Sequence, residues 1–204
     1  MLIALIRHGQ TDWNLAERMQ GRSDIPLNAT GREQARVAAS ALVNESWDVV
    51  VSSPLGRARE TAEIIAGTLD MPLGATYDDL IEQDFGEAEG TFVADLDRRW
   101  PDRDFAGKEP DAEMGPRGIR ALERIAVDHP GARVLAVAHG TLIRHTLAAI
   151  TGHEERHYPK LENASSSFVR FTDAAWRVHT VGGADFTEVL VGIDERAAAL
   201  RLAS

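Results

Sequence analysis

Two histidines in this chain each stand at the end of a short apolar run and directly before a glycine. His8 has an arginine beside it, Arg7, and His139 lies far along the chain. A third apolar run leads through a serine-rich turn to Arg57. A neutral imidazole nitrogen can attack phosphorus, and a guanidinium group presents a planar fork of donors that fits phosphate oxygens. These residue types therefore indicate chemistry on a phosphoryl group.

The three apolar runs, residues 2–6, 49–51 and 134–138, share one pattern of a small polar turn followed by a helix-like stretch. Uninterrupted apolar runs are typical of strands buried on both faces, as in a parallel sheet that helices cover. In open α/β sheets, ligands bind outside the carboxyl ends of the strands. We therefore expect the two histidines and the arginines to converge on one crevice.

Helix signals between these runs support an α/β chain. Thr30 with Glu33 fits a capping box, and Ser53 followed by Pro54 fits a cap with proline in the first turn. Gly152 is expected to end a helix. The other expected elements are helices over residues 55–69 and 141–150, a hairpin of residues 167–171 and 177–181 with its turn at 173–175, a strand over 188–192, and a C-terminal helix over 195–202.

The fold class predicted from this order is α/β, a three-layer α/β/α sandwich with a mostly parallel central sheet. The 204 residues fit one domain, residues 1–204, because no linker or shift in composition marks a boundary. Residues 91–118 differ from the rest and are expected to form an irregular, lid-like insertion with a short helix around 92–100.

Composition excludes several classes of function. The 22 lysines and arginines against 32 aspartates and glutamates give a net charge of −10, which argues against binding of nucleic acid or of an anionic membrane. The chain has no cysteine, so thiolate catalysis and disulfides are excluded. The short apolar start is not expected to act as a secretory signal, and no stretch approaches the roughly 20 residues of a membrane span. A cytoplasmic location is the expectation.

The triplet Arg7-His8-Gly9 resembles the RHG signature of the histidine phosphatase superfamily, the phosphoglycerate-mutase-like proteins. Further resemblances follow in the family's order along most of the chain. They are Asn14 with Gln20-Gly21 and residues 24–27, Thr30-Gly31 with Gln34-Ala35, residues 52–58 with Thr61-Ala62, residues 80–82 with Phe85-Gly86 and Glu89-Gly90, and residues 137–140 with Ile143-Arg144. Several motifs in one order are far more specific than a single triplet.

The resemblance implies a role for each matched residue. His8 is the expected nucleophile, forming a phosphohistidine, and Glu82 the expected proton donor to the leaving group. Arg7, Arg57 and His139 are expected to hold the phosphoryl oxygens. The remaining expected phosphate-binding residues are Asn14, Gln20, Gly21, Gly140 and Thr141. No metal ion or cofactor is implied, since the arginines supply the positive charge.

Simpler interpretations accompany several of these residues. Arg57 could be a surface charge on a helix, as Arg59 is expected to be, and Arg144 is expected to brace the fold through a salt bridge. Glu87 and Glu89 lie close enough to compete with Glu82 for its role. The side chains Trp13, Met19, Trp100 and Phe105 could line a pocket or pack in a core.

Residues 153–157 read His-Glu-Glu-Arg-His and fit the H-E-x-x-H pattern of zinc proteases. That pattern requires a helix that carries both histidines on one face. Gly152 and Pro159 leave scarcely one turn between them, so the segment is expected to be an exposed connection without zinc.

The function predicted is hydrolysis of a small phosphorylated metabolite through a phosphohistidine. Two alternatives remain open: a cofactor-dependent phosphoglycerate mutase, and a non-catalytic binder of phosphorylated ligands. The family's acid-containing motif after the insertion is matched only loosely, by residues 112–114, and residues 181–184 lack the usual polar ending. Substrate identity is therefore open, and the C-terminal helix leaves a homodimer as a further expectation.

Overall fold

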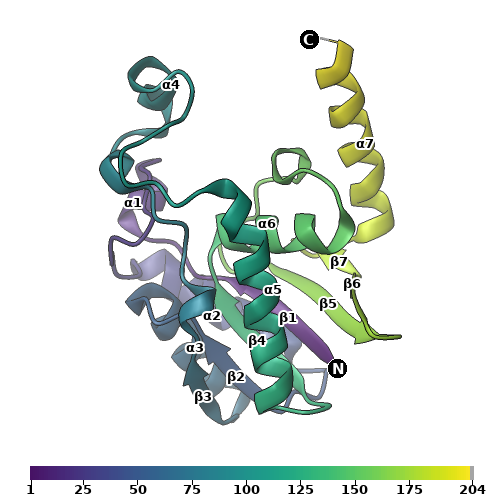
Figure 1. Ribbon diagram of the computed structural model, residues 1–204. Coiled ribbons are helices and arrows are strands. Elements are labelled where there is room, and N and C mark those ends of the chain that lie inside the picture. The colour runs from purple at the N-terminus through teal and green to yellow at the C-terminus, as the bar shows by residue number, and fades with distance from the viewer. Residues whose placement is uncertain (203–204) are drawn as a thin grey trace.

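A computed structural model describes the backbone of residues 1–202 and the side chains of residues 1–198. Its centre is a six-stranded sheet in the order β3-β2-β4-β1-β5-β6 (Figure 1). The strands are β1 (Leu2–Arg7), β2 (Val49–Ser52), β3 (Leu73–Thr76), β4 (Arg133–Ala138), β5 (Ser166–Thr172) and β6 (Ala175–Val178). Strands β3, β2, β4 and β1 pair in parallel, and β5 and β6 pair antiparallel. The predicted mostly parallel sheet is confirmed.

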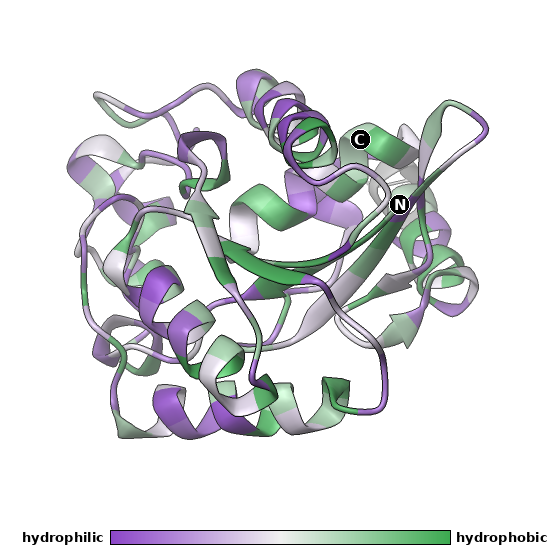
Figure 2. Ribbon diagram, turned by 90° about the horizontal axis from the view of Figure 1, so that it is seen from below, coloured by the Kyte–Doolittle hydropathy of each residue, from purple (hydrophilic) through white to green (hydrophobic). Residues whose placement is uncertain are grey.

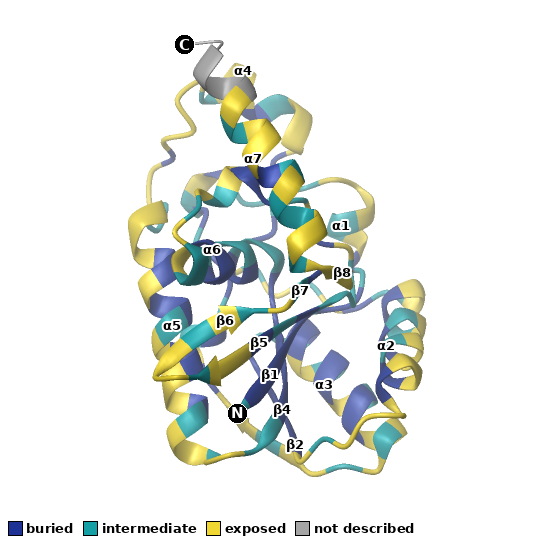
Figure 3. Ribbon diagram, turned by 90° about the vertical axis from the view of Figure 1, so that its right-hand side faces the viewer, coloured by how far each residue is buried: buried dark blue, intermediate teal, exposed yellow. Residues whose placement is uncertain are grey.

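Helices cover both faces of this sheet. Alternate residues of β1 divide between two cores: Ile3 and Leu5 pack with α5 (Asp111–Asp128) and α6 (Gly140–Thr151). Ala4 and Ile6 pack with α2 (Ala29–Leu42) and α3 (Gly56–Leu69). Figure 3 shows the buried strands between these two helix pairs, and Figure 2 shows the hydrophobic colour concentrated on the central strands. Burying an isoleucine or leucine side chain contributes about 1.5–3 kcal/mol. The three-layer fold class is confirmed.

Two of the predicted helix caps are wrong, although α3 matches the helix predicted over residues 55–69. Helix α2 is capped by Asn28, whose Oδ1 accepts the Gly31 amide at 2.9 Å, so Thr30 lies inside the first turn. Helix α3 has Leu55 at its cap position, without a side-chain cap. Ser53 is instead buried and lies 2.8 Å from His139. Gly152 ends α6 in the left-handed conformation, as predicted.

The C-terminal part differs in one element. The hairpin of β5 and β6 is confirmed, with Asp173 and Ala174 at positive φ in its turn. A small pair, β7 (Thr180–Val181) and β8 (Ala184–Asp185), follows it. The predicted strand over residues 188–192 is wrong, because α7 (Phe186–Leu202) begins there. Asp185 Oδ1 accepts the Thr187 amide at 2.8 Å and thereby favours a helix start.

The insertion is shorter than predicted, because residues 111–118 belong to α5. The preceding residues include a 3₁₀ turn (Val93–Asp95) and α4 (Leu96–Arg99), close to the predicted short helix. Leu96 and Phe105 form a small third core with Phe85 and Ala88, against which Met19 and Trp100 pack. This core joins the insertion to the loop after α1 (Asp12–Leu15).

Gly118 sets how closely α5 approaches α6. A Cβ at this position would lie 1.9 Å from Thr146 Oγ1. We expect Gly118→Ala to lower the free energy of unfolding by about 1–3 kcal/mol, because overpacking must displace a helix. Urea denaturation followed by circular dichroism measures it.

Gly67 provides the matched control on α3, because a Cβ there would meet nothing within 4 Å. Gly67→Ala is expected to raise stability by about 0.5–1 kcal/mol through helix propensity alone. Equal stability changes in the two variants would contradict the close α5–α6 approach.

Candidate active site

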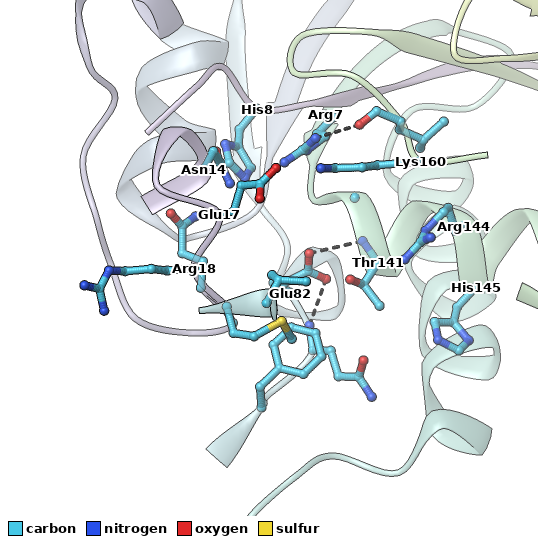
Figure 4. A pocket seen from close by; sticks show the side chains of 18 of the residues that line it. Arg7, His8, Asn14, Glu17, Arg18, Glu82, Thr141, Arg144, His145 and Lys160 are labelled. Carbon is cyan, nitrogen blue, oxygen red and sulfur yellow. Dashed lines mark hydrogen bonds between the residues drawn. The ribbon is translucent and has the colours of Figure 1, made fainter. Parts of the chain in front are cut away.

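A cavity of about 760 Å³ opens beyond the carboxyl ends of β1 and β4. In Figure 4, Arg7 and His8 face Glu82 across it. Most of the predicted site residues line this cavity: Arg7, His8, Asn14, Gln20, Gly21, Arg57, Glu82, Gly140 and Thr141. His139 is not among its walls. It is fully buried and lies behind His8, with the two ring centroids 5.1 Å apart.

The surroundings of His8 define its tautomer. Its Nδ1 lies 2.7 Å from the Gly9 carbonyl oxygen, so Nδ1 carries the hydrogen and donates it. Its Nε2 is then an acceptor, and the Nε–H of Arg57 donates to it at 3.3 Å. Burial lowers the pKa of His8 well below 6.5, and the charges of Arg57 and Arg7 lower it further. His8 is therefore a neutral imidazole with its reactive lone pair on Nε2.

Arg57 is completely buried, which contradicts the surface alternative for this residue. Its Nη2 donates to the Gly21 carbonyl at 2.6 Å and its Nη1 to the Ser23 carbonyl at 2.7 Å. Burial lowers the pKa of Arg57 to about 10, so it stays charged at neutral pH. The guanidinium thus joins the loop of residues 20–23 to the histidine.

Glu89 holds the same loop from the other side. Its carboxylate accepts the amides of Arg22 at 2.7 Å and of Ser23 at 2.8 Å. Gly21 adopts φ +52°, and any Cβ there would collide with Glu89 Oε1. The loop is therefore fixed by a carboxylate on one side and a guanidinium on the other.

Two buried donors near His8 have no hydrogen-bond partner among the described residues, Arg7 Nε and His139 Nδ1. Arg7 Nη1 donates to the Leu161 carbonyl at 2.6 Å, and His139 Nε2 lies 2.8 Å from Ser53 Oγ. Burial, followed by the charge of Arg57, lowers the pKa of His139 well below 6.5. Buried polar atoms without partners require an explanation, and next to a cavity a bound ligand is one.

Glu82 is buried, and its carboxylate is held by backbone amides. Oε1 accepts from Gln83 at 2.9 Å and from Leu142 at 3.0 Å, and Oε2 accepts from Thr141 at 3.1 Å. Two of these amides belong to the first turn of α6, where backbone donors lack partners within the helix. The Thr141 amide, which we predicted for the phosphate cradle, is therefore engaged by Glu82.

Asn14 and Gln20 line the cavity and have their amide oxygens in internal contacts. Asn14 Oδ1 accepts from the Thr11 amide at 3.2 Å, and Gln20 Oε1 accepts from Thr11 Oγ1 at 2.5 Å. Gly9 serves packing rather than an anion, since a Cβ there would lie 2.3 Å from the Gly31 carbonyl oxygen.

Sequence reasoning missed Asn163. Its Nδ2 donates to the His8 carbonyl at 3.0 Å and to Asn14 Oδ1 at 3.2 Å, and the residue lines the cavity. Its only sequence signal is a place shortly before a strand. Ser53 was noticed as a helix cap, whereas the structure places it against His139.

The simpler interpretations are resolved by contacts. Arg59 pairs with Glu63 on the surface at 3.1 Å, and Arg144 pairs with Glu155 at 2.7 Å, both as expected. Of the three candidate glutamates only Glu82 lines the cavity. Met19 and Phe105 line the cavity as well. Trp100 packs against the small third core, and Trp13 lies against Gly90.

The H-E-x-x-H segment lacks the helix that a zinc protease needs. Helix α6 ends before it, and only a 3₁₀ turn (Glu155–His157) follows. Among the described residues no group of three or more His, Cys, Asp or Glu side chains is arranged to hold a metal ion.

The walls of the cavity carry a positive excess in a chain whose net charge is −10. Eight cationic side chains line it against five carboxylates. The cations are Arg7, Arg18, Arg57, Arg103, Lys108, Arg144, Arg156 and Lys160, and the carboxylates are Glu17, Glu82, Asp111, Glu155 and Glu162. Such a cleft concentrates the field and attracts anions. None of the helices in the described part of the chain has the length and apolar character needed to cross a membrane.

The fold and this constellation are those of one family. The chain belongs to the histidine phosphatase superfamily, whose branch 1 model matches residues 3–183. The chain is similar to the uncharacterized phosphatase PhoE of Bacillus subtilis strain 168, with 41% identity over 177 residues, covering 86% of this chain and 91% of the relative. It is also similar to a metal-independent phosphoserine phosphatase of Arabidopsis thaliana, with 35% identity, covering 85% and 78%.

Solved structures agree with these relatives. A mycobacterial glucosyl-3-phosphoglycerate phosphatase, solved with VO3, matches with a TM-score of 0.82 and 27% identity, covering 90% of this chain and 99% of that chain. YhfR of Bacillus stearothermophilus matches with a TM-score of 0.79 and 28% identity, covering 89% and 96%. The predicted family is confirmed.

The low pKa of His8 makes stability depend on pH. The unfolded chain binds a proton at His8 near pH 6.5, whereas the folded chain excludes it until the pH is much lower. The free energy of unfolding therefore falls as the pH decreases below this value, by at most about 1.4 kcal/mol per pH unit for one histidine. His8→Asn is expected to reduce that fall.

Urea denaturation at about pH 7.5 and about pH 5.5 measures the difference. His179→Asn, which changes an exposed histidine, is the control and should behave like the wild type. An identical loss of stability in the wild type and in His8→Asn would show that His8 does not exclude its proton on folding.

Proposed function

We propose that this protein hydrolyses phosphomonoesters of small metabolites, without a metal ion, through a phosphoryl group carried on His8. One observation carries the proposal. A buried, neutral imidazole presents Nε2 beside the guanidinium of Arg57, and the unpartnered donors Arg7 Nε and His139 Nδ1 lie next to it. A phosphoryl group is the ligand that a nucleophilic nitrogen and this set of donors would bind together.

In the first step, His8 Nε2 attacks phosphorus while the bond to the ester oxygen breaks. Arg57 and Arg7 neutralise charge on the phosphoryl oxygens as the loose transition state forms. His139 donates from Nδ1–H, which requires that Ser53 Oγ–H donates to its Nε2; the low pKa of His139 keeps this neutral tautomer. The Nδ1 hydrogen bond to Gly9 stabilises the ring of the phosphohistidine.

Glu82, in its acid form at the start of the cycle, would give its proton to the leaving alkoxide oxygen and become a carboxylate. In the second step a water oxygen attacks phosphorus, the bond to His8 Nε2 breaks, and Glu82 takes a proton from that water. The amides of Thr141 and Leu142 keep the carboxylate in place through both steps. The products are an alcohol and inorganic phosphate, and the enzyme returns to its starting state.

The names of similar proteins support hydrolysis of this kind. They include the metal-independent phosphoserine phosphatase and the glucosyl-3-phosphoglycerate phosphatase. A probable phosphoglycerate mutase GpmB of Photorhabdus laumondii is 34% identical, which keeps a mutase as the second candidate. Supplying monophosphoglycerate separates the two, since a mutase yields the isomer and a phosphatase yields free phosphate. The cytoplasmic location, the one-domain organisation and the homodimer stay predictions.

His8→Ala is expected to abolish the release of phosphate from p-nitrophenyl phosphate, because the nucleophile is removed. The reduction should exceed about 10³-fold, the usual scale when an activated nucleophile is lost. Arg59→Ala is the control, since Arg59 pairs with Glu63 on the surface. Comparable turnover in His8→Ala and the wild type would overturn the proposal.

Glu82→Gln is expected to slow the hydrolysis of alkyl phosphates by about 10²–10⁴-fold, because their leaving oxygen requires a proton. p-Nitrophenolate leaves without that help, so its release should change much less. Steady-state kcat/KM on phosphoserine and p-nitrophenyl phosphate measures the two effects, because kcat/KM reports the steps up to the phosphohistidine and not its hydrolysis, which both substrates share. Equal losses of kcat/KM on both substrates would contradict the role of Glu82 as proton donor.

A further inference from the structure

Arg117 lies outside every motif discussed so far, and yet it contacts the backbone that carries Glu82. It belongs to α5 and is buried, with 7% of its surface exposed. We propose that Arg117 is a positioning residue for proton transfer, which fixes Glu82 through its main chain. This inference rests on the proposed function, because it requires Glu82 to be the proton donor.

The guanidinium of Arg117 donates to three carbonyls of the segment that leads to Glu82. Its Nη1 donates to Asp79 at 3.0 Å and to Ile81 at 2.6 Å, and its Nη2 lies 3.5 Å from the carbonyl oxygen of Glu82 itself. This segment contains only a 3₁₀ turn (Asp78–Leu80) before an irregular stretch. Buried carbonyls outside regular structure need donors from elsewhere, and Arg117 supplies them.

The counter-ion of Arg117 is Glu109, which connects this segment to the loop of residues 20–23. Glu109 accepts from Arg117 at 2.8 and 3.0 Å, with the two side chains only 12% and 8% exposed. Burial opposes ionisation of Glu109, but the hydrogen bonds and the charge of Arg117 outweigh it and lower the pKa. Glu109 also accepts from Arg22 at 3.2 Å, beside Gly21. A buried ion pair adds little net stability after desolvation, so its geometry is the more informative property.

Glu82 is consequently held at both ends by two different helices. The start of α6 holds its carboxylate, and Arg117 of α5 holds its backbone. The absence of a side chain at Gly118 lets the two helices approach, as the close contact with Thr146 shows. The next residue, Gln83, is fastened to α5 as well, by a 2.6 Å hydrogen bond to Asp111. A shift of either helix would therefore move the carboxylate relative to the substrate.

The test compares two substrates that differ in their need for a proton, phosphoserine and p-nitrophenyl phosphate. Arg117→Met keeps the length of the side chain and removes its donors. It should lower kcat/KM on phosphoserine by about 10–100-fold more than kcat/KM on p-nitrophenyl phosphate, the scale expected for a misplacement of about 1 Å. The double variant Arg117→Met with Glu109→Gln should give the same discrimination without leaving a buried charge unpaired. If Arg117→Met alone does not fold, the double variant still provides the comparison of the two substrates.

Arg120→Met is the matched control. Arg120 lies on the same helix and pairs with Asp79 of the same segment at 3.4 Å, but its side chain is 56% exposed. It should leave both rates within about twofold, as surface ion pairs contribute little. In a Glu82→Gln background, Arg117→Met should cause no further discrimination between the substrates, because the group that it positions is gone.

The outcomes separate the two levels of the proposal. Glu82→Gln could slow phosphoserine more than p-nitrophenyl phosphate while the Arg117 variants slow both substrates equally. Arg117 would then be a structural residue, and only this inference would be overturned. Absence of discrimination in Glu82→Gln itself would remove the proton donor from the proposed function, and the inference would fall with it. Discrimination in both, absent from Arg120→Met, is the expected result.

Discussion

Charged donors buried around a neutral histidine are the constraint on which the remaining structure depends. Taking Arg57 and Arg7 out of water costs free energy, and repulsion of Arg57 by Arg7 adds to that cost. The fold recovers part of it by giving Arg57 the carbonyls of residues 21 and 23, and Arg7 the carbonyl of residue 161. Within the described part of the chain, Arg7 Nε and His139 Nδ1 keep no hydrogen-bond partner, and they are the donors that the proposed phosphoryl group would use. Pre-organised donors of this kind need no rearrangement when charge develops on a phosphoryl group.

In this site, backbone amides and side chains interact with different negatively charged groups. The start of a helix is an obvious anion site, and α6 begins at the cavity with Gly140. The amides of Thr141 and Leu142 nevertheless bind the protein's own carboxylate, Glu82, which leaves the arginine and histidine side chains for the proposed phosphoryl group. The same helix thereby fixes the proposed proton donor, while the strand ends carry the proposed nucleophile.

The rim of the cavity is built by two separate parts of the chain. The loop after α1, the segment after Glu82 and the insertion together contribute the apolar side chains Met19, Phe85 and Phe105 and the cations Arg18, Arg103 and Lys108. The segment from α6 onward contributes Arg144, Arg156 and Lys160 with the carboxylates Glu155 and Glu162. The insertion is attached through a small core of its own, so its residues can differ without disturbing the sheet.

The sequence by itself determined the fold class and the centre of the site. Arg7, His8 and His139 follow uninterrupted apolar runs, and such runs become parallel strands whose carboxyl ends meet at one edge, so convergence follows from local pattern alone. Local pattern failed where two candidates competed for one role over a few residues, as with Asn28 and Thr30 at the start of α2, or where weak alternation concealed a helix, as in α7.

Only the tertiary structure decided which partners the buried polar groups find. Asn163 donates to the His8 carbonyl across 155 positions of the sequence, and Ser53 contacts His139 across 86. Arg117 donates to the backbone of the segment that leads to Glu82, from a helix whose first residues the sequence assigned to an irregular insertion. A hydrogen bond between distant residues leaves no periodicity in the sequence, because it depends on the packing of whole helices against the sheet rather than on the residues next to it.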